Sequence, residues 1–129
     1  MIIDIRCNLE TGEAKILSVQ EITKKDVITI ISSYFDVDMV DVTNIKKMKN
    51  EIVMTRQFII YWLIYIFDTP SKEIKKILNY KENSSIITTS LNKLKDLLFD
   101  QKDEKYTRPY NNHSKIFAGF GIKINIIEK

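Results

Sequence analysis

The chain has 129 residues, which suits one domain built around a single hydrophobic core. Hydrophobic residues make up 44% of the sequence and charged residues 29%, a balance that excludes extended disorder. The formal net charge is only +3, so the composition permits binding to a polyanion through a local basic patch without demanding it.

The chain has few residues of the types that form disulfides, zinc sites and phosphate-binding loops. One cysteine, Cys7, and one histidine, His113, exclude an intramolecular disulfide and a zinc site of His and Cys ligands. We expect Cys7 to be a core residue and His113 a solvated loop residue, in a reducing, cytoplasmic setting. With three glycines the chain has no GxxxxGK[ST] phosphate loop. The sequence therefore predicts no enzyme activity, no cofactor and no metal site.

Two apolar segments are too short or too interrupted for a targeting or membrane role. Asp4 and Arg6 interrupt the apolar start of the chain, so we expect no signal peptide. The apolar run 58–67 falls far short of the ~20 residues that a membrane span needs, and it predicts a buried helix that includes Trp62.

The first 50 residues predict a β-hairpin followed by two helices. Residues 1–20 alternate apolar and polar side chains around a Thr-Gly-Glu turn, as hairpins do. Residues 21–35 predict a helix, because Val27, Ile30, Ile31 and Tyr34 recur at helical spacing. A short helix over 38–42 and a polar loop with three lysines over 44–50 follow.

The longest predicted helix covers 51–67, with Asn50 as its cap. The next, 70–78, begins at Pro70 after a cap by Asp68 or Thr69. Its two faces differ sharply, with an apolar inner face and a basic outer stripe. The inner residues are Ile74, Ile77 and Leu78, and the outer ones are Lys72, Lys75 and Lys76.

A turn over 79–82, where Asn79 suits a left-handed helix end, leads to a helix over about 84–99. Residues 100–115 predict a polar loop that contains Pro109. Residues 116–129 predict a strand, which we expect to pair with the hairpin. The whole chain thus predicts one mainly helical domain, with a helical core over 21–99 and a small β-sheet made by both chain ends.

Two helices joined by a short turn describe a helix-turn-helix, in which the second helix enters the major groove of DNA. The short side chains of the second helix would let its backbone approach base edges and would offer donors and acceptors. The alternative is that these residues cap the helix and line a solvated face. They are Asn83, Ser84, Ser85, Thr88 and Thr89.

The order of residues from about 27 to 94 resembles a known family. The matching pieces are Tyr34-Phe35, Asp41-Val42, Lys46-Lys47, Glu51-Ile52-Val53, Arg56-Gln57, Ser71, Glu73-Ile74 and Ser84-Ser85-Ile86. In this order they resemble the C-terminal DNA-binding domain of DnaA, the bacterial chromosomal replication initiator. The resemblance implies a Trp-repressor-like helix-turn-helix that binds double-stranded DNA in replication or regulation of a bacterial or mobile-element genome.

The resemblance also implies roles for individual residues. Lys46 and Lys47 would reach into the minor groove, Arg56 would hold a phosphate, and the helix 70–78 would meet the DNA backbone. Glu82-Asn83-Ser84-Ser85 would stand where the family reads bases with Asp-His-Thr-Thr. The full set of expected DNA-binding residues is Lys46, Lys47, Arg56, Ser71, Lys72, Lys75, Lys76, Lys81, Glu82, Asn83, Ser84, Ser85, Thr88 and Thr89.

Several departures from the family favour a second hypothesis, a protein-interaction module that keeps the helical scaffold with a degenerate DNA site. The family's histidine is Asn83 here, lysine replaces arginine in the loop, and turn glycines become Asn79 and Tyr80. The long helix adds apolar residues that we expect the terminal strands to cover, or else a partner protein or a second copy of the chain. These residues are Tyr61, Ile64 and Tyr65.

Overall fold

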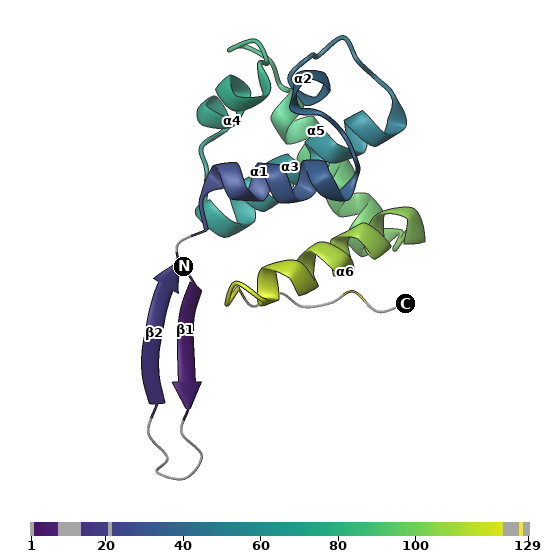
Figure 1. The fold of residues 1–129 in the computed structure, drawn as a ribbon. Coiled ribbons are helices and arrows are strands. Elements are labelled where there is room, and N and C mark those ends of the chain that lie inside the picture. The colour runs from purple at the N-terminus through teal and green to yellow at the C-terminus, as the bar shows by residue number, and fades with distance from the viewer. Residues whose placement is uncertain (1, 8–13, 21, 123–126, 128–129) are drawn as a thin grey trace.

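The computed structural model describes residues 2–7, 14–20, 22–122 and 127, and it is mainly helical (Figure 1). The helices, with one π-helical segment labelled η1, are α1 Lys24–Tyr34, α2 Met39–Val42, α3 Asn50–Phe67, α4 Ser71–Leu78, α5 Ile86–Lys95, η1 Asp96–Asp100 and α6 Glu104–Ala118. None of the helices described is long and apolar enough to cross a membrane.

The strands β1, Ile2–Cys7, and β2, Ala14–Gln20, pair antiparallel in the segment predicted as a hairpin. They extend away from the helices, at the end of the molecule opposite α2 and α4 (Figure 1). The predicted sheet between both chain ends is not supported, since the described part of the chain contains only these two strands. Residues 116–118 of the expected C-terminal strand are helical instead, and residues 123–126 lie outside the described residues.

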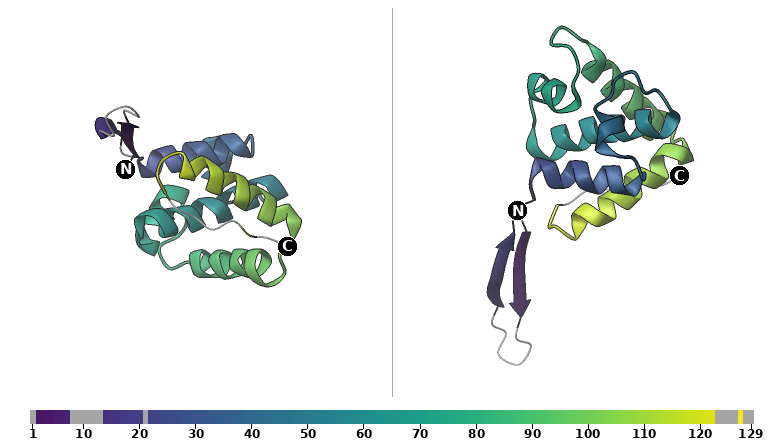
Figure 2. Two further views of the ribbon diagram at one scale, coloured as in Figure 1. Left: turned by 90° about the horizontal axis from the view of Figure 1, so that it is seen from below. Right: turned by 45° about the horizontal axis from the view of Figure 1, so that its top comes forward.

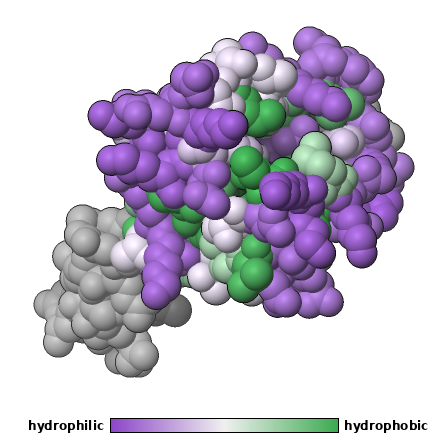
Figure 3. Space-filling view, turned by 90° about the horizontal axis from the view of Figure 1, so that it is seen from above, coloured by the Kyte–Doolittle hydropathy of each residue, from purple (hydrophilic) through white to green (hydrophobic). Residues whose placement is uncertain are grey.

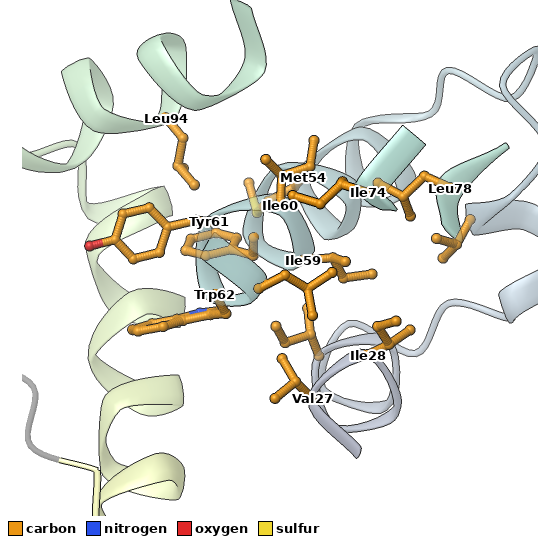
Figure 4. Packing of buried hydrophobic residues seen from close by; sticks show 14 of the residues in the cluster. Val27, Ile28, Met54, Ile59, Ile60, Tyr61, Trp62, Ile74, Leu78 and Leu94 are labelled. Atoms are coloured by element: carbon orange, nitrogen blue, oxygen red, sulfur yellow. The ribbon is translucent and has the colours of Figure 1, made fainter. Parts of the chain in front are cut away.

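The helix α3 forms the centre of the core, as the apolar run predicts. Its side chains between Phe58 and Leu63 are almost wholly buried, Trp62 among them. Figure 4 shows apolar side chains of α1, α4 and α5 pointing at α3 from different sides. The free energy gained by burying these large side chains, about 1.5–3 kcal/mol each, holds the helices together.

The helix ends differ in detail from the predicted caps. Asn50 is the first residue of α3 rather than its cap, and Lys49 takes the cap position without a side-chain bond. Pro70 takes the cap position of α4 instead of its first helical position. Asp68 does not cap α4, and it ends α3 in a left-handed conformation (φ 51°). Thr69 is also no cap, since its hydroxyl donates to the Leu63 carbonyl at 2.8 Å.

The helix α6 replaces the polar loop predicted over 100–115, so that prediction is wrong. Asp103 caps α6 by accepting from the Lys105 backbone N–H at 3.1 Å. Pro109 lies inside the helix, where it removes one backbone hydrogen bond. Burial of Tyr110, His113 and Phe117 along one face offsets that loss. This face also covers part of the long helix, a role that we expected of the terminal strands.

Candidate nucleic-acid interface

The basic loop, residues 43–49, is shaped by one buried side chain of α3. Arg56 is only 3% exposed, and its guanidinium donates to four backbone carbonyls of α2 and the loop. Nε donates to Val42 at 2.8 Å, Nη1 to Lys47 at 2.8 Å, and Nη2 to Asp41 at 3.0 Å and to Asn44. These bonds fix the path of the loop.

The expectation that Arg56 holds a phosphate is therefore wrong for this conformation. Four of the five guanidinium N–H groups are already engaged, and the side chain lies beneath the loop instead of facing solvent. Neither of the two ion pairs found among the described residues includes Arg56. Its charge is thus balanced by carbonyl dipoles, and it adds a fixed positive charge under a loop whose own lysines are exposed.

The turn between α4 and α5 lies against the basic loop. Asn79 ends α4 in the predicted left-handed conformation, with φ 63°. Its side-chain amide donates to the carbonyl of Thr43, the residue that ends α2, at 3.3 Å. Burial raises the pKa of the next residue, Tyr80, while its interaction with the Arg56 guanidinium opposes this rise. Asn79 therefore fastens the turn to the loop, and Tyr80 lies near Arg56, the residue of α3 that supports the loop.

The turn itself is longer than predicted. It covers residues 79–85, because α5 begins at Ile86 rather than near residue 84. The Lys75 ammonium donates to the carbonyl of Glu82 at 2.9 Å and so braces the turn from α4. A hollow of about 360 Å³ opens between α4 and the turn, lined by Lys72, Lys75, Lys76, Tyr80 and Glu82.

The charges around α4 are mostly positive. Lys72 and Lys76 are exposed, and so is Lys81 in the turn. The single acidic residue of α4, Glu73, pairs with the Lys24 ammonium of α1 at 2.5 Å, which compensates its charge. Glu82 in the turn and Asp38 at the start of α2 are exposed, and neither belongs to the two ion pairs found in the described part of the chain.

The polar residues at the start of α5 divide into two groups. Ser84 lies one residue before the cap position of α5, and its hydroxyl accepts from the Ile86 backbone N–H at 3.2 Å, while the Thr89 hydroxyl donates to the Ser85 carbonyl at 3.1 Å. Hydrogen bonds within the start of α5, the alternative to DNA contact, thus explain these two hydroxyls. The side chains of Asn83, Ser85 and Thr88 are exposed, and Ser85 takes the cap position of α5 without a side-chain capping bond.

The candidate residues gather at one end of the molecule. Figures 1 and 2 place α2, the basic loop and the α4–α5 turn at the end opposite the hairpin. Of the fourteen expected residues, Arg56 is buried, Lys75 and Ser84 are half-buried, and the others are exposed. The terminal segments described do not cover them. Sequence reasoning missed the hydrogen bond from Asn79 to Thr43, for which the sequence carries no signal.

At the other side of α3, His113 lies in an aromatic cluster rather than in solvent as expected. It is fully buried, and its Nδ1 accepts from Trp62 Nε1 at 3.2 Å. Rings of Tyr34, Phe35 and Phe58 surround it with centroids 4.6–5.5 Å away. This burial lowers the pKa of His113 to about 3. Over the described ranges, no three His, Cys, Asp or Glu residues gather where a metal ion could be held.

No protein-family model matches the chain, and no curated protein or solved structure is significantly similar to it. The resemblance to the DNA-binding domain of DnaA therefore stays a hypothesis drawn from the residues themselves.

Proposed function

We propose that this protein binds double-stranded DNA, with α4 and α5 acting as a Trp-repressor-like helix-turn-helix and the basic loop as a second contact. One observation supports this proposal above the others. The Asn79–Thr43 hydrogen bond joins the turn to the end of α2, so two lysine-rich segments far apart in sequence share one end of the molecule. A duplex is the partner whose closely spaced phosphates suit two such segments.

The kinds of side chain favour backbone contacts over base reading. Lysines act as point charges on phosphates, whereas reading guanine favours the arginine fork, and Arg56 is buried. The start of α4 has no side-chain cap, and since the Glu73 and Ile74 N–H groups donate to the Pro70 carbonyl, the backbone N–H groups of Ser71 and Lys72 are the ones suited to a phosphate. Ser85, Asn83 and Thr88 would supply the modest base preference from the major groove. The proposed setting is a cytoplasmic replication or regulatory protein of a bacterial or mobile-element genome, without ATPase activity.

The proposal is tested by the salt dependence of binding to a labelled duplex. The logarithm of the binding constant should fall with the logarithm of salt concentration by about 0.9 per phosphate contacted. Lys46→Ala and Lys76→Ala should each flatten this slope by about one unit. Lys115→Ala on α6 is the matched control, because this exposed lysine lies outside the proposed interface. Equal slopes for all three variants would contradict the proposal.

The second candidate function, a protein-interaction module, is favoured by a different surface. Tyr65 of α3 is 50% exposed and stacks on Tyr61, and Phe99 of η1 is 44% exposed beside Tyr110. Exposed aromatic side chains of this kind are enriched at protein interfaces. If no duplex binds even at low salt, while Tyr65→Ser alters the oligomeric state or abolishes binding of a protein partner, this second function replaces the first.

A further inference from the structure

The hairpin of β1 and β2 is a sheet with two open edges. Its strands pair with each other, and the described part of the chain contains no third strand beside them. The hairpin projects from the helical body in two views of the molecule (Figures 1 and 2). A two-stranded hairpin is marginally stable in water, and further strands stabilise it. An open edge can pair with a strand of another chain.

The two edges of the hairpin differ in regularity. The pairing of β1 with β2 skips Leu17, so β2 contains one extra residue at a bulge that lies opposite the step from Asp4 to Ile5. A bulge bends its strand and hinders pairing with a further strand. β1 contains no such extra residue. Its edge is therefore the one better suited to extension of the sheet.

The sequence of β1 is complementary to itself. If two copies of β1 run antiparallel with Ile5 at the centre, Asp4 of each copy lies opposite Arg6 of the other copy. Opposite charges at facing positions stabilise an antiparallel pair of strands. β2 contains one charged residue, Lys15, and so offers no opposite charge to a second β2. The charge pattern thus identifies a second copy of this chain as the partner of β1.

A like-charge pair within the hairpin favours the same arrangement. Arg6 is the register partner of Lys15, and facing charges of one sign destabilise a pair of strands. Beside a second copy, Arg6 would have Lys15 on one side and the second copy's Asp4 on the other. The added carboxylate would compensate the two cations that the hairpin alone brings together.

We propose that two copies of this chain associate through β1 and form one four-stranded antiparallel sheet, with the two β1 strands at its centre. Alternation along a strand places Ile3, Ile5 and Cys7 on one face of β1. The rows across this face of the four-stranded sheet would contain only apolar residues, because the register partners of these three are also apolar. The partners are Val19, Ile16 and Ala14.

This inference goes beyond the proposed function and does not depend on it. The hairpin lies at the end of the molecule opposite the basic loop, so pairing through β1 leaves that end free in both copies (Figure 1). The view onto that end shows mainly hydrophilic side chains (Figure 3). A two-fold pair uses the β1 edge of both copies and leaves the two bulged β2 edges outside. Association therefore stops at the dimer.

The experiment measures the mass of the full chain by sedimentation velocity over a wide range of protein concentrations at low salt. The wild type should shift from the mass of one chain to that of two as its concentration rises. Asp4→Arg and Arg6→Asp each turn two symmetry-related pairs of opposite charges into like-charge pairs. Each should therefore raise the dissociation constant of the dimer by at least about tenfold.

The double variant Asp4→Arg/Arg6→Asp restores opposite charges at both positions. Its dissociation constant should return to within about threefold of the wild-type value. Lys15→Asp is the matched control, because it changes the net charge as Arg6→Asp does but lies on β2, away from the proposed interface. Arg6→Asp also removes the like-charge pair inside the hairpin, so a loss of the dimer in this variant cannot result from a weaker hairpin.

Three results would overturn the inference. One is a monomer at every concentration, and another is a dimer that tolerates both single substitutions. The third is a double variant as weak as the single ones, which would exclude the register centred on Ile5. If Tyr65→Ser abolishes the dimer while Asp4→Arg does not, the copies associate through α3 instead of β1. None of these outcomes changes the salt slopes that test DNA binding, so the two proposals fail separately.

Discussion

The side chain of Asn79, which ends α4, donates a hydrogen bond to the backbone carbonyl of Thr43, which ends α2. These residues are 36 positions apart in the sequence. The bond brings the end of the first helix of the proposed helix-turn-helix against the start of the basic loop. Asn79 thus has two structural roles: it ends α4 in a left-handed conformation, and it links two surface segments by a hydrogen bond.

Substitution of Asn79 separates these two roles. Asn79→Gly keeps the left-handed conformation but loses the link, so we expect the free energy of unfolding to change by less than about 1 kcal/mol. Asn79→Ala loses both and should cost about 1 kcal/mol more, because a Cβ disfavours positive φ. Urea denaturation measures these changes. Both variants should bind DNA more weakly than the wild type if the link orients the loop, whereas equal affinity would make the link irrelevant to binding.

Replacement of Arg56 tests whether it supports the loop or contacts DNA. Arg56→Met leaves four carbonyls without their donor, so we expect a loss of at least about 3 kcal/mol in the free energy of unfolding. Arg56→Lys should recover little of this loss, because one ammonium cannot reach acceptors spread over α2 and the loop. Urea denaturation followed by the fluorescence of Trp62, the only tryptophan, gives the values.

The matched control is Arg108→Ala on α6. Arg108 is exposed and pairs with Glu104 one helical turn away, a contact worth about 0.3–0.5 kcal/mol. If Arg56→Met proved as mild as Arg108→Ala and only weakened DNA binding, the phosphate role expected from the sequence would be restored.

The buried His113 predicts a loss of stability in weak acid. Its pKa is about 3 in the folded protein and near 6.5 when unfolded, so between these values only the unfolded chain is protonated. Stability is therefore complete above pH 6.5 and falls as the pH drops towards 3. From pH 7 to pH 5 we expect a loss of about 2 kcal/mol in the free energy of unfolding.

Denaturation curves at several pH values measure this loss, and the chain suits the test because His113 is its only histidine. Carboxylates stay ionised in this range and contribute little. The variant His113→Phe, which cannot titrate, should show a nearly flat profile between pH 7 and pH 5. A flat profile in the wild type would mean that His113 is open to solvent, as the sequence analysis expected.

Helices were predicted correctly from the sequence where the apolar periodicity was strong. The helices α3 and α4 have unbroken apolar faces, and both lie within a few residues of their predicted ends. The helix α6 escaped prediction because Pro109 and a run of Asn residues outweighed the pattern of Tyr110, His113 and Phe117, whose spacing of 3 and 4 residues is helical. Histidine counts as polar in such patterns, although its neutral ring packs well against aromatic neighbours.

The candidate site could be predicted only as a set of surface residues. Lys72 and Lys76 of α4 and Thr88 and Thr89 of α5 are exposed where helical periodicity puts them, whereas Lys46, Lys47 and Lys81 lie in a loop and a turn. The burial of Arg56 had no sequence signal, because its four acceptors are backbone carbonyls, which every residue possesses. The acceptor of the Asn79 side chain is also a backbone carbonyl, that of Thr43, so the type of residue at position 43 could not predict this contact.

The adjacent residues Ser84 and Ser85 allow the helix-capping and DNA-contact hypotheses to be tested side by side. The Ser84 hydroxyl accepts from the first backbone N–H of α5, so Ser84→Ala should cost about 1 kcal/mol in the free energy of unfolding through loss of this hydrogen bond. Ser85 exposes its side chain without a capping bond, so Ser85→Ala should change stability by less than about 0.5 kcal/mol. Its effect should fall on DNA instead, with a reduced ratio between the tightest and weakest duplexes in a randomised pool and an unchanged salt slope. If Ser85→Ala leaves both stability and duplex preference unchanged, α5 does not read bases, and any DNA binding depends on the lysines alone.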